Sequence, residues 1–139
     1  MKITTSRDPS AKTRRFGKAL ASFLSIPYVN RGKQSPGEDE TWLVVVEDHG
    51  NPSGLVKRCG GEEELLSFTL SLEPSSGRPK KLVPTVTGLR KDALPIARFF
   101  ELEWQERPTH EGGPKRALAV SSGQIDFIDE DEVKFRLKI

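Results

Sequence analysis

Apolar residues recur along this chain at two spacings, one typical of helices and one typical of strands. In the stretch from Phe16 to Leu24, apolar residues fall three or four positions apart, which places them on one face of a helix. Asp8 can cap the N-terminus of such a helix, and Pro9 suits its first position. The pattern therefore predicts a helix that follows Asp8 and ends at about Leu24.

The other apolar runs have the length of strands. Residues 41–47 contain the near-continuous run WLVVV, which is typical of a central strand covered on both faces. Apolar residues alternate over 66–72, which indicates a half-buried strand that pairs antiparallel with 55–59. Turns rich in Asn, Gly and Pro separate the runs, at 30–33 and 49–52 among others. Further strands are predicted at 2–5, 26–29, 82–86, 116–121, 124–129 and 133–139.

A faint repeat links the two halves of the chain. The segments ITTSRDPSAKTRRFGKAL and VPTVTGLRKDALPIARFF both combine a strand, a basic turn and a helix, and an apolar strand run follows each of them. In the second segment the helix is predicted at about 93–102, where Pro95 must lie in the first turn or break the helix. Any α/β unit that occurs twice gives this pattern, so the likeness alone does not establish a duplication.

Length and composition predict one compact α/β domain over residues 1–139, a mixed sheet with helices. A chain of 139 residues, 35% of them hydrophobic, buries roughly two thirds of its unfolded surface when it folds as one unit. Cys59 is the single cysteine, so it has no partner for an internal disulfide or a metal site. No apolar run reaches the roughly 20 residues of a membrane span or resembles a signal peptide. We therefore expect a cytoplasmic, monomeric protein that makes no contact with a membrane.

Positive charge is concentrated at the N-terminal end. The first 34 residues contain eight basic residues and one acidic residue, a net charge of +7, whereas residues 35–139 contain fourteen basic and nineteen acidic residues, a net charge of −5. Arg14, Arg15 and Lys18 fall on the side of the predicted helix away from its apolar stripe. A segregated basic surface of this kind is typical of proteins that bind phosphate groups. The acidic residues at 62–64 and 129–132 are predicted to be solvated ends of strands.

The basic segment supplies the candidate contacts to the phosphates of RNA. Ser6 and Ser10 stand near the start of the predicted helix, where amide and hydroxyl donors and the helix dipole favour an anion. Asn30 either reads a base edge or holds the turn, and Tyr28 is the strongest nearby candidate for stacking on an unpaired base. A solvated basic face is the alternative, as is an internal ion pair for Arg7. The candidate RNA-binding residues are Arg7, Ser10, Lys12, Arg14, Arg15, Lys18, Asn30, Arg31 and Lys33.

Four motifs stand in a fixed order within the first 55 residues. They are TTSRDPS at 4–10, TRRF at 13–16, VNRGK at 29–33 and HGNP at 49–52. This ordered set resembles the opening of the Brix domain family of ribosome-biogenesis proteins. The resemblance implies an archaeal single-domain member that takes part in rRNA processing and ribosomal subunit assembly. It also implies an α/β fold of two similar halves, each related to the anticodon-binding domain of class II aminoacyl-tRNA synthetases.

The sequence contains none of the common motifs of enzymes. Motifs of the types HxxxH, CxxC and GxSxG, a phosphate-binding loop and a dinucleotide fingerprint are all absent. Glu47, Asp48 and Asp126 could converge as a nuclease site, but their spacing does not favour it. We therefore predict a non-catalytic protein without a cofactor, which binds rRNA or pre-rRNA and assists its processing and the assembly of ribosomal subunits. The alternative is a protein-interaction module whose basic face docks on an acidic ribosomal or assembly protein.

Overall fold

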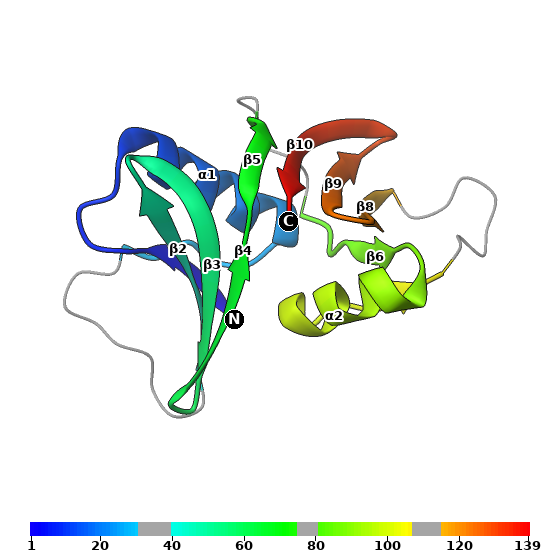
Figure 1. Ribbon diagram of the computed structural model, residues 1–139, viewed down its shortest axis with the longest axis horizontal. Helices are drawn as coiled ribbons and strands as arrows, with labels where there is room; N and C mark the ends of the chain where they lie inside the picture. Colours follow the sequence, from blue (N-terminus) through cyan, green and yellow to red (C-terminus); the bar gives the residue numbers. More distant parts are fainter. Residues whose placement is uncertain (31–39, 75–80, 107–114) are drawn as a thin grey trace. The chain divides into compact units, whose positions relative to one another are not determined.

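The computed structural model describes residues 1–30, 40–74, 81–106 and 115–139. Its strands form two sheets, and one helix accompanies each sheet (Figure 1). The chain divides into two compact units, Met1–Thr69 and Leu70–Ile139. The α/β class predicted from the sequence is confirmed, in the form of two mixed sheets. A single domain over residues 1–139 stays a prediction.

The first unit consists of a four-stranded sheet and one helix. Its elements are β1 (Lys2–Thr5), α1 (Ala11–Leu24), β2 (Thr41–Asp48), β3 (Asn51–Cys59) and β4 (Glu62–Ser67). The strands stand in the order β1-β2-β3-β4, with β1 parallel to β2 and the other pairs antiparallel. Two parallel neighbours need a crossover, and α1 lies between them in the chain. Residues 42–45 of β2 are buried, which confirms the predicted central strand.

The second unit contains the six-stranded sheet and the other helix. Its elements are β5 (Thr69–Leu72), β6 (Thr85–Thr87), α2 (Arg90–Phe100), β7 (Trp104–Gln105), β8 (Arg116–Ser121), β9 (Gln124–Asp129) and β10 (Glu132–Lys138). The strand order is β5-β10-β9-β8-β6-β7. β6 runs parallel to β7 and β8, whereas β8, β9 and β10 form an antiparallel meander. The predicted strands at 116–121 and 124–129 are confirmed residue for residue.

The two units share one topology. In each, a first strand leads to a helix, a later strand (β2 or β8) pairs parallel with the first, and two further strands extend the sheet antiparallel. The order β1-β2-β3-β4 thus corresponds to β6-β8-β9-β10. β5 is an addition beyond β10 in the second sheet. The faint repeat seen in the sequence is therefore a repeat of structure.

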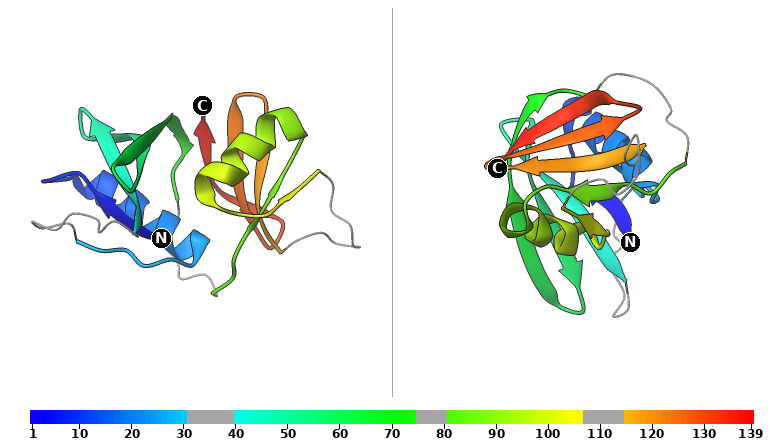
Figure 2. Two further views of the ribbon diagram at one scale, coloured as in Figure 1. Left: turned by 90° about the horizontal axis from the view of Figure 1, so that it is seen from below. Right: turned by 90° about the vertical axis from the view of Figure 1, so that its right-hand side faces the viewer.

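One helix packs on the sheet of each unit (Figure 2). The apolar core of each unit includes the buried side of this helix and apolar side chains of the same sheet. In the first unit, the apolar stripe of α1 is buried, and the ring of Phe16 lies 5.3 Å from the ring of Phe68. In the second unit, Phe127 stacks on Phe135 with ring centroids 4.2 Å apart. The buried residues of α1 and of α2 both recur at helical spacing, so burial of apolar surface explains which side of each helix packs on its sheet.

α1 begins two residues later than the sequence pattern predicts, so the prediction of Asp8 as the N-cap is wrong. Ser10 is the N-cap, with φ −64° and ψ 162°, and its Oγ accepts a hydrogen bond from the Thr13 N–H at 3.1 Å. Asp8 instead has φ 52° in the connection before the helix. A serine hydroxyl that reaches the third helical N–H is the geometry of a favoured cap, and it sets the start of α1.

Two predicted strands differ from the structure because of their pairing. Over 26–29 only an isolated parallel bridge forms, between Ile3 and Tyr28, so the prediction of a full strand there is wrong. The strand predicted at 66–72 is interrupted at Phe68, and its two parts lie in different sheets, as the end of β4 and as β5. The Phe68 side chain is buried. β7 (Trp104–Gln105) was not predicted, and the other strands match their predictions to within a few residues.

α2 continues through Pro95 instead of starting or ending at it. The helix begins at Arg90, so Pro95 lies beyond the first turn, and the prediction for this proline is wrong. A proline inside a helix removes one helical hydrogen bond and costs about 3 kcal/mol. Ala93, Ile96 and Ala97 are buried on the same helix. Packing of this apolar stripe stabilises α2 despite the proline.

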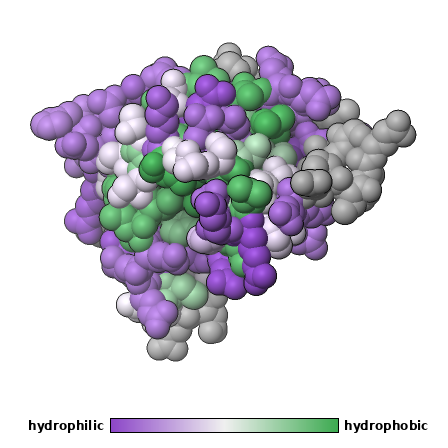
Figure 3. Space-filling view, turned by 45° about the vertical axis from the view of Figure 1, so that its right-hand side comes forward, coloured by the Kyte–Doolittle hydropathy of each residue, from purple (hydrophilic) through white to green (hydrophobic). Residues whose placement is uncertain are grey.

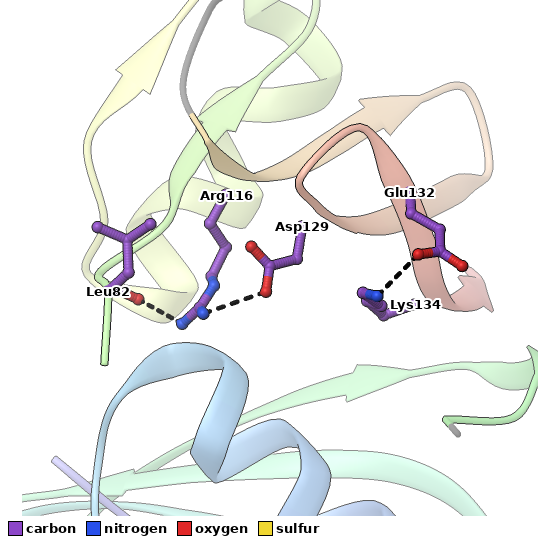
Figure 4. Close-up of polar contacts among 5 residues, drawn as sticks. All are labelled: Leu82, Arg116, Asp129, Glu132 and Lys134. Carbon is purple, nitrogen blue, oxygen red and sulfur yellow. Dashed lines mark hydrogen bonds and ion pairs between the residues drawn. The ribbon is translucent and has the colours of Figure 1, made fainter. Parts of the chain in front are cut away.

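Arg116 is a charged side chain buried in the second unit (Figure 4). The whole residue is 2% exposed. Its Nη1 donates a hydrogen bond to the Leu82 carbonyl at 2.7 Å, and its Nη2 lies 3.2 Å from Asp129 Oδ2. Arg116 and Asp129 stand opposite each other on β8 and β9. The prediction that Asp129 is a solvated strand end is therefore wrong, because this carboxylate balances a buried guanidinium.

Hydrophilic side chains predominate on the surface shown in Figure 3, with apolar patches between them. The large apolar residues exposed in the described part of the chain are Leu65, Leu72, Leu82, Val83, Leu89 and Ile139. Single exposed apolar residues are ordinary on a protein surface. Neither α1 nor α2 is long and apolar enough to cross a membrane.

Candidate nucleic-acid interface

The exposed side of α1 carries three cations, which we call the α1 basic face: Arg14, Arg15 and Lys18. All three side chains are exposed. At about 100° per residue, they fall within a sector of about 100° around the helix axis. Phe16 and Leu20 are buried on the other side of the helix. The sequence pattern predicted this division of the helix into an apolar and a basic side, and the structure shows it.

The α1 basic face has no internal counter-charge in the described part of the chain. Among residues 1–30, 40–74, 81–106 and 115–139, no carboxylate forms an ion pair with Arg14, Arg15 or Lys18. The same holds for Arg7, which is exposed in the connection before α1. The alternative of an internal ion pair for Arg7 finds no support among these residues. Unpaired exposed cations are hydrated, and they are available to an anionic ligand.

An aromatic ring lies next to the α1 basic face. The Lys18 Nζ stands 5.8 Å from the centroid of the Tyr28 ring, within the range of a cation–π contact. The ring approaches Gly17 so closely that a Cβ at this position would lie 3.1 Å from Tyr28 Cε2. Tyr28 is half-buried. Glycine at position 17 therefore allows this ring to lie against the helix beside Lys18.

The N-terminus of α1 is occupied by a carboxylate of the same chain. The Ser10 N–H donates to both carboxylate oxygens of Glu47, at 3.1 Å and 3.3 Å, and the Thr13 hydroxyl also donates to Glu47. The Ser10 hydroxyl donates to the Gly50 carbonyl at 2.7 Å. A carboxylate is favoured here by the orphan N–H groups and by the helix dipole. Ser10 is thus engaged within the chain, and it is not among the phosphate contacts that we propose below.

Sequence reasoning missed the role of Glu47. It considered this residue as one of three carboxylates of a nuclease site, and no local signal connects it to a helix whose N-cap lies 37 residues earlier. In the structure, β2 ends beside the start of α1, because β2 is the parallel partner of the strand that leads into that helix. The tertiary fold therefore places the carboxylate on the helix N-terminus.

The environment of Glu47 predicts a pH-dependent contribution to stability. The hydrogen bond from the Thr13 hydroxyl, assisted by the Ser10 N–H, holds the pKa of Glu47 below its ordinary value of 4.5, although partial burial opposes this shift. Because the pKa is lowered by folding, ionised Glu47 stabilises the fold above pH 4.5, and this contribution is lost as the pH falls through the lowered pKa. We expect Glu47→Gln to lower the free energy of unfolding by about 1.5 kcal/mol at neutral pH.

Urea unfolding measured over a range of pH checks this prediction. The difference in stability between the native chain and Glu47→Gln should shrink as the pH falls below 4.5. Glu62→Gln is the control, because Glu62 is exposed on β4. A Glu47→Gln effect that stays constant down to low pH would show that the ionised carboxylate does not stabilise the helix start.

The other candidate residues differ in their contacts and exposure, and two of them lie outside the described residues. Lys12 is half-buried, and its Nζ donates to Asn51 Oδ1 at 2.9 Å, so it links α1 to the start of β3. Asn30 is exposed. Arg31 and Lys33 lie outside the described residues. The structure therefore brings together Arg14, Arg15 and Lys18 on one helix side, and it gives Ser10 and Lys12 contacts within the chain.

The described residues give no support to a nuclease site. No group of three or more His, Cys, Asp or Glu side chains among them is arranged to hold a metal ion. Glu47 accepts hydrogen bonds at the start of α1, and Asp126 forms an ion pair with Arg136 in the second unit. Each of these carboxylates thus has a structural partner of its own.

Comparison with known proteins gives the family. No protein-family model matches the chain. A probable Brix domain-containing ribosomal biogenesis protein of Archaeoglobus fulgidus is 49% identical over 148 residues, which cover 99% of this chain and 93% of that protein. A protein of the same description from Methanosarcina mazei is 31% identical over 151 residues, which cover 100% of this chain and 96% of that protein.

Solved structures agree with these relatives. The crystal structure of Mil, an archaeal Imp4-like protein, matches with a TM-score of 0.77 and 27% identity, over 100% of this chain and 96% of that chain. A probable ribosomal biogenesis protein from Aeropyrum pernix K1 shares the fold, with a TM-score of 0.62 and 18% identity over 99% of this chain and 92% of that chain. The family that the opening motifs indicated is thus confirmed by relatives that match over nearly the full length of the chain. This chain belongs to the Brix domain-containing ribosomal biogenesis proteins.

Proposed function

We propose that this protein is an RNA-binding ribosome-biogenesis factor, which holds rRNA or pre-rRNA through the α1 basic face and performs no chemistry on it. One observation supports this more than any other. Arg14, Arg15 and Lys18 are exposed together on one side of α1, and no carboxylate among the described residues pairs with them. The relatives that cover the full chain are named ribosomal biogenesis proteins, which agrees with an RNA partner.

The chemistry of the α1 basic face suits the backbone of RNA. Each cation that neutralises a phosphate releases condensed counterions, so binding gains free energy at low salt and weakens as salt rises. Arg7, exposed before the helix, adds a fourth cation near its start. The Tyr28 ring beside Lys18 offers one aromatic surface to an unpaired base. Aromatic side chains at this face are few, so contacts to phosphate dominate over the reading of bases.

The expected role is to assist pre-rRNA processing and subunit assembly by holding the RNA in a competent fold. We expect the protein to work as a monomer in the cytoplasm, without a cofactor. Ribosomal or assembly proteins are further expected partners, since the names of the relatives place those proteins in ribosome biogenesis.

The experiment is a binding titration of the full chain with rRNA fragments at two salt concentrations, about 50 mM and about 200 mM. We expect the native protein to bind more weakly at the higher salt. Arg14→Glu combined with Lys18→Glu should weaken binding at low salt about a hundredfold, and it should reduce the slope of log affinity against log salt by about two. Lys134→Glu combined with Lys138→Glu is the control, because it changes the net charge equally in the second unit.

Other outcomes would contradict the proposal. A native protein that does not bind rRNA at low salt would favour the alternative, in which the α1 basic face docks on an acidic ribosomal or assembly protein. An equal loss of affinity in both double variants would show that RNA binding depends on the net charge of the protein and not on the α1 basic face. RNA cleavage that depends on added divalent metal would contradict the non-catalytic role.

A further inference from the structure

The two units repeat each other residue by residue around their helix C-termini. α1 is followed by Ser25 and α2 by Glu101, and both residues adopt the left-handed conformation, with φ 59° and 55°. The next N–H in each unit donates back to the helix, from Ile26 to the Ala21 carbonyl at 3.0 Å and from Leu102 to the Ala97 carbonyl at 2.9 Å. The two C-caps are 76 positions apart in the chain (101 − 25).

The same offset holds where the chain returns to the sheet. Tyr28 pairs with Ile3 of β1, and Trp104 pairs with Val86 of β6, in both cases in parallel. Tyr28 and Trp104 are again 76 positions apart (104 − 28). An aromatic residue therefore stands beside the first strand in both units. The constant offset gives a structural alignment of α1 with α2.

This alignment places cations of α2 at the positions of the α1 basic face. Arg90 corresponds to Arg14, and Lys91 corresponds to Arg15. Leu94 takes the position of Lys18, but Arg98 takes that of Ser22, one turn further along the same side. Counted at about 100° per residue, these positions lie in the same sector of about 100° in both helices. We call Arg90, Lys91 and Arg98 the α2 basic face.

The α2 basic face points away from the core. Its three side chains are exposed, whereas Ile96, Phe99 and Phe100 on the other side are buried. Asp92 is the one acidic residue of the helix, and it is half-buried outside that sector. No carboxylate in the described parts of the chain forms an ion pair with Arg90 or Lys91.

The charge of this helix contrasts with its surroundings. Residues 35–139 carry a net charge of −5, yet α2 has three basic residues and one acidic residue among its 11 residues. If α2 were simply a solvated helix in an acidic segment, its acidic residues would be expected to equal or outnumber its basic residues. The excess of cations on one exposed side thus matches α1 in both position and sign.

We propose that the α2 basic face is a second surface that binds RNA phosphates, the structural counterpart of the α1 basic face. The proposal rests on the proposed function, because it assigns the same ligand to the second unit. Trp104 occupies the place of Tyr28, and its indole N–H donates to the Gly88 carbonyl at 3.0 Å, which fixes the ring. The protein then contacts RNA backbone with both of its repeats.

The test uses the full chain, the same rRNA fragment and the same two salt concentrations. Arg90→Glu combined with Lys91→Glu should weaken binding about tenfold at low salt and reduce the salt slope by about two. Lys134→Glu combined with Lys138→Glu is the control, with the same change of net charge in the same unit. If charge reversal at the helix start lowers stability, Arg90→Gln combined with Lys91→Gln should give a smaller loss of affinity in the same direction.

Failure of this inference differs from failure of the proposed function. If the native chain binds RNA and the α1 double variant weakens it, but the α2 variants bind like the control, the α2 basic face makes no phosphate contact. If the native chain does not bind RNA, both proposals are overturned. A loss in the α2 variants together with an unchanged control supports a second RNA surface.

Discussion

Replacing Gly88 with alanine is expected to lower the free energy of unfolding by about 4 kcal/mol, from strained backbone and a steric clash together. Gly88 has φ 133°, and a Cβ at this position would lie 2.3 Å from the Val120 carbonyl oxygen and 3.2 Å from its carbon. The clashing atoms belong to the backbone of a central strand, so they cannot move aside as a flexible side chain would. Urea unfolding of the variant measures the loss.

The position of Gly88 in the repeat explains why no side chain fits. Gly88 and Leu89 alone connect β6 to α2, whereas Ser6 to Ser10 connect β1 to α1. The shorter connection brings its backbone against β8. Gly123→Ala is the control, because Gly123 also has a positive φ of 76° but its Cβ would meet nothing closer than 3.6 Å. This control should cost only about 1 kcal/mol. Equal losses in the two variants would contradict the close approach at Gly88.

Arg116→Met is expected to lower the free energy of unfolding by about 3 kcal/mol, because it leaves the Asp129 carboxylate without its buried partner. The Arg116 side chain is 1% exposed and that of Asp129 is 13% exposed. The Leu82 carbonyl also loses the hydrogen bond that it accepts from Arg116. Denaturation by urea at neutral pH checks the size of the effect.

A second ion pair in the same unit is the matched control for Arg116. Lys134 and Glu132 are also paired, at 2.9 Å, but their side chains are 37% and 74% exposed (Figure 4). Lys134→Met should therefore cost less than about 1 kcal/mol. Arg116→Met combined with Asp129→Leu should regain stability relative to Arg116→Met alone, because no charge is then buried without a partner. A double variant less stable than the single one would contradict this account.

Local sequence patterns predicted the parts of the site that depend on one helix. The apolar stripe that begins at Phe16 fixed which side of α1 is buried, and this placed Arg14, Arg15 and Lys18 in solvent. Likewise, the strands predicted at 116–121 and 124–129 coincide with β8 and β9. Periodicity is a short-range property of the chain, so it can be read without knowledge of the fold.

The α2 basic face shows where such reading failed. Sequence reasoning placed the second helix at about 93–102, where Pro95 had to lie in the first turn or break the helix. It placed Arg90 and Lys91 in a basic turn before that helix. The structure begins the helix at Arg90, and the two cations then belong to an exposed helical side. Apolar packing of the helix on its sheet outweighs the cost of the proline, and no local rule contains that packing.

By itself, the sequence determined the charge segregation, the apolar stripe of α1, most strands and the family resemblance, since each depends on residue types at short spacing. Only the tertiary structure decided which distant groups meet. It placed the Glu47 carboxylate on the N-terminus of α1, where a phosphate had been predicted, and it buried Arg116 against Asp129. These contacts join residues that are 37 and 13 positions apart in the chain, and strand pairing in the folded sheets brings them together.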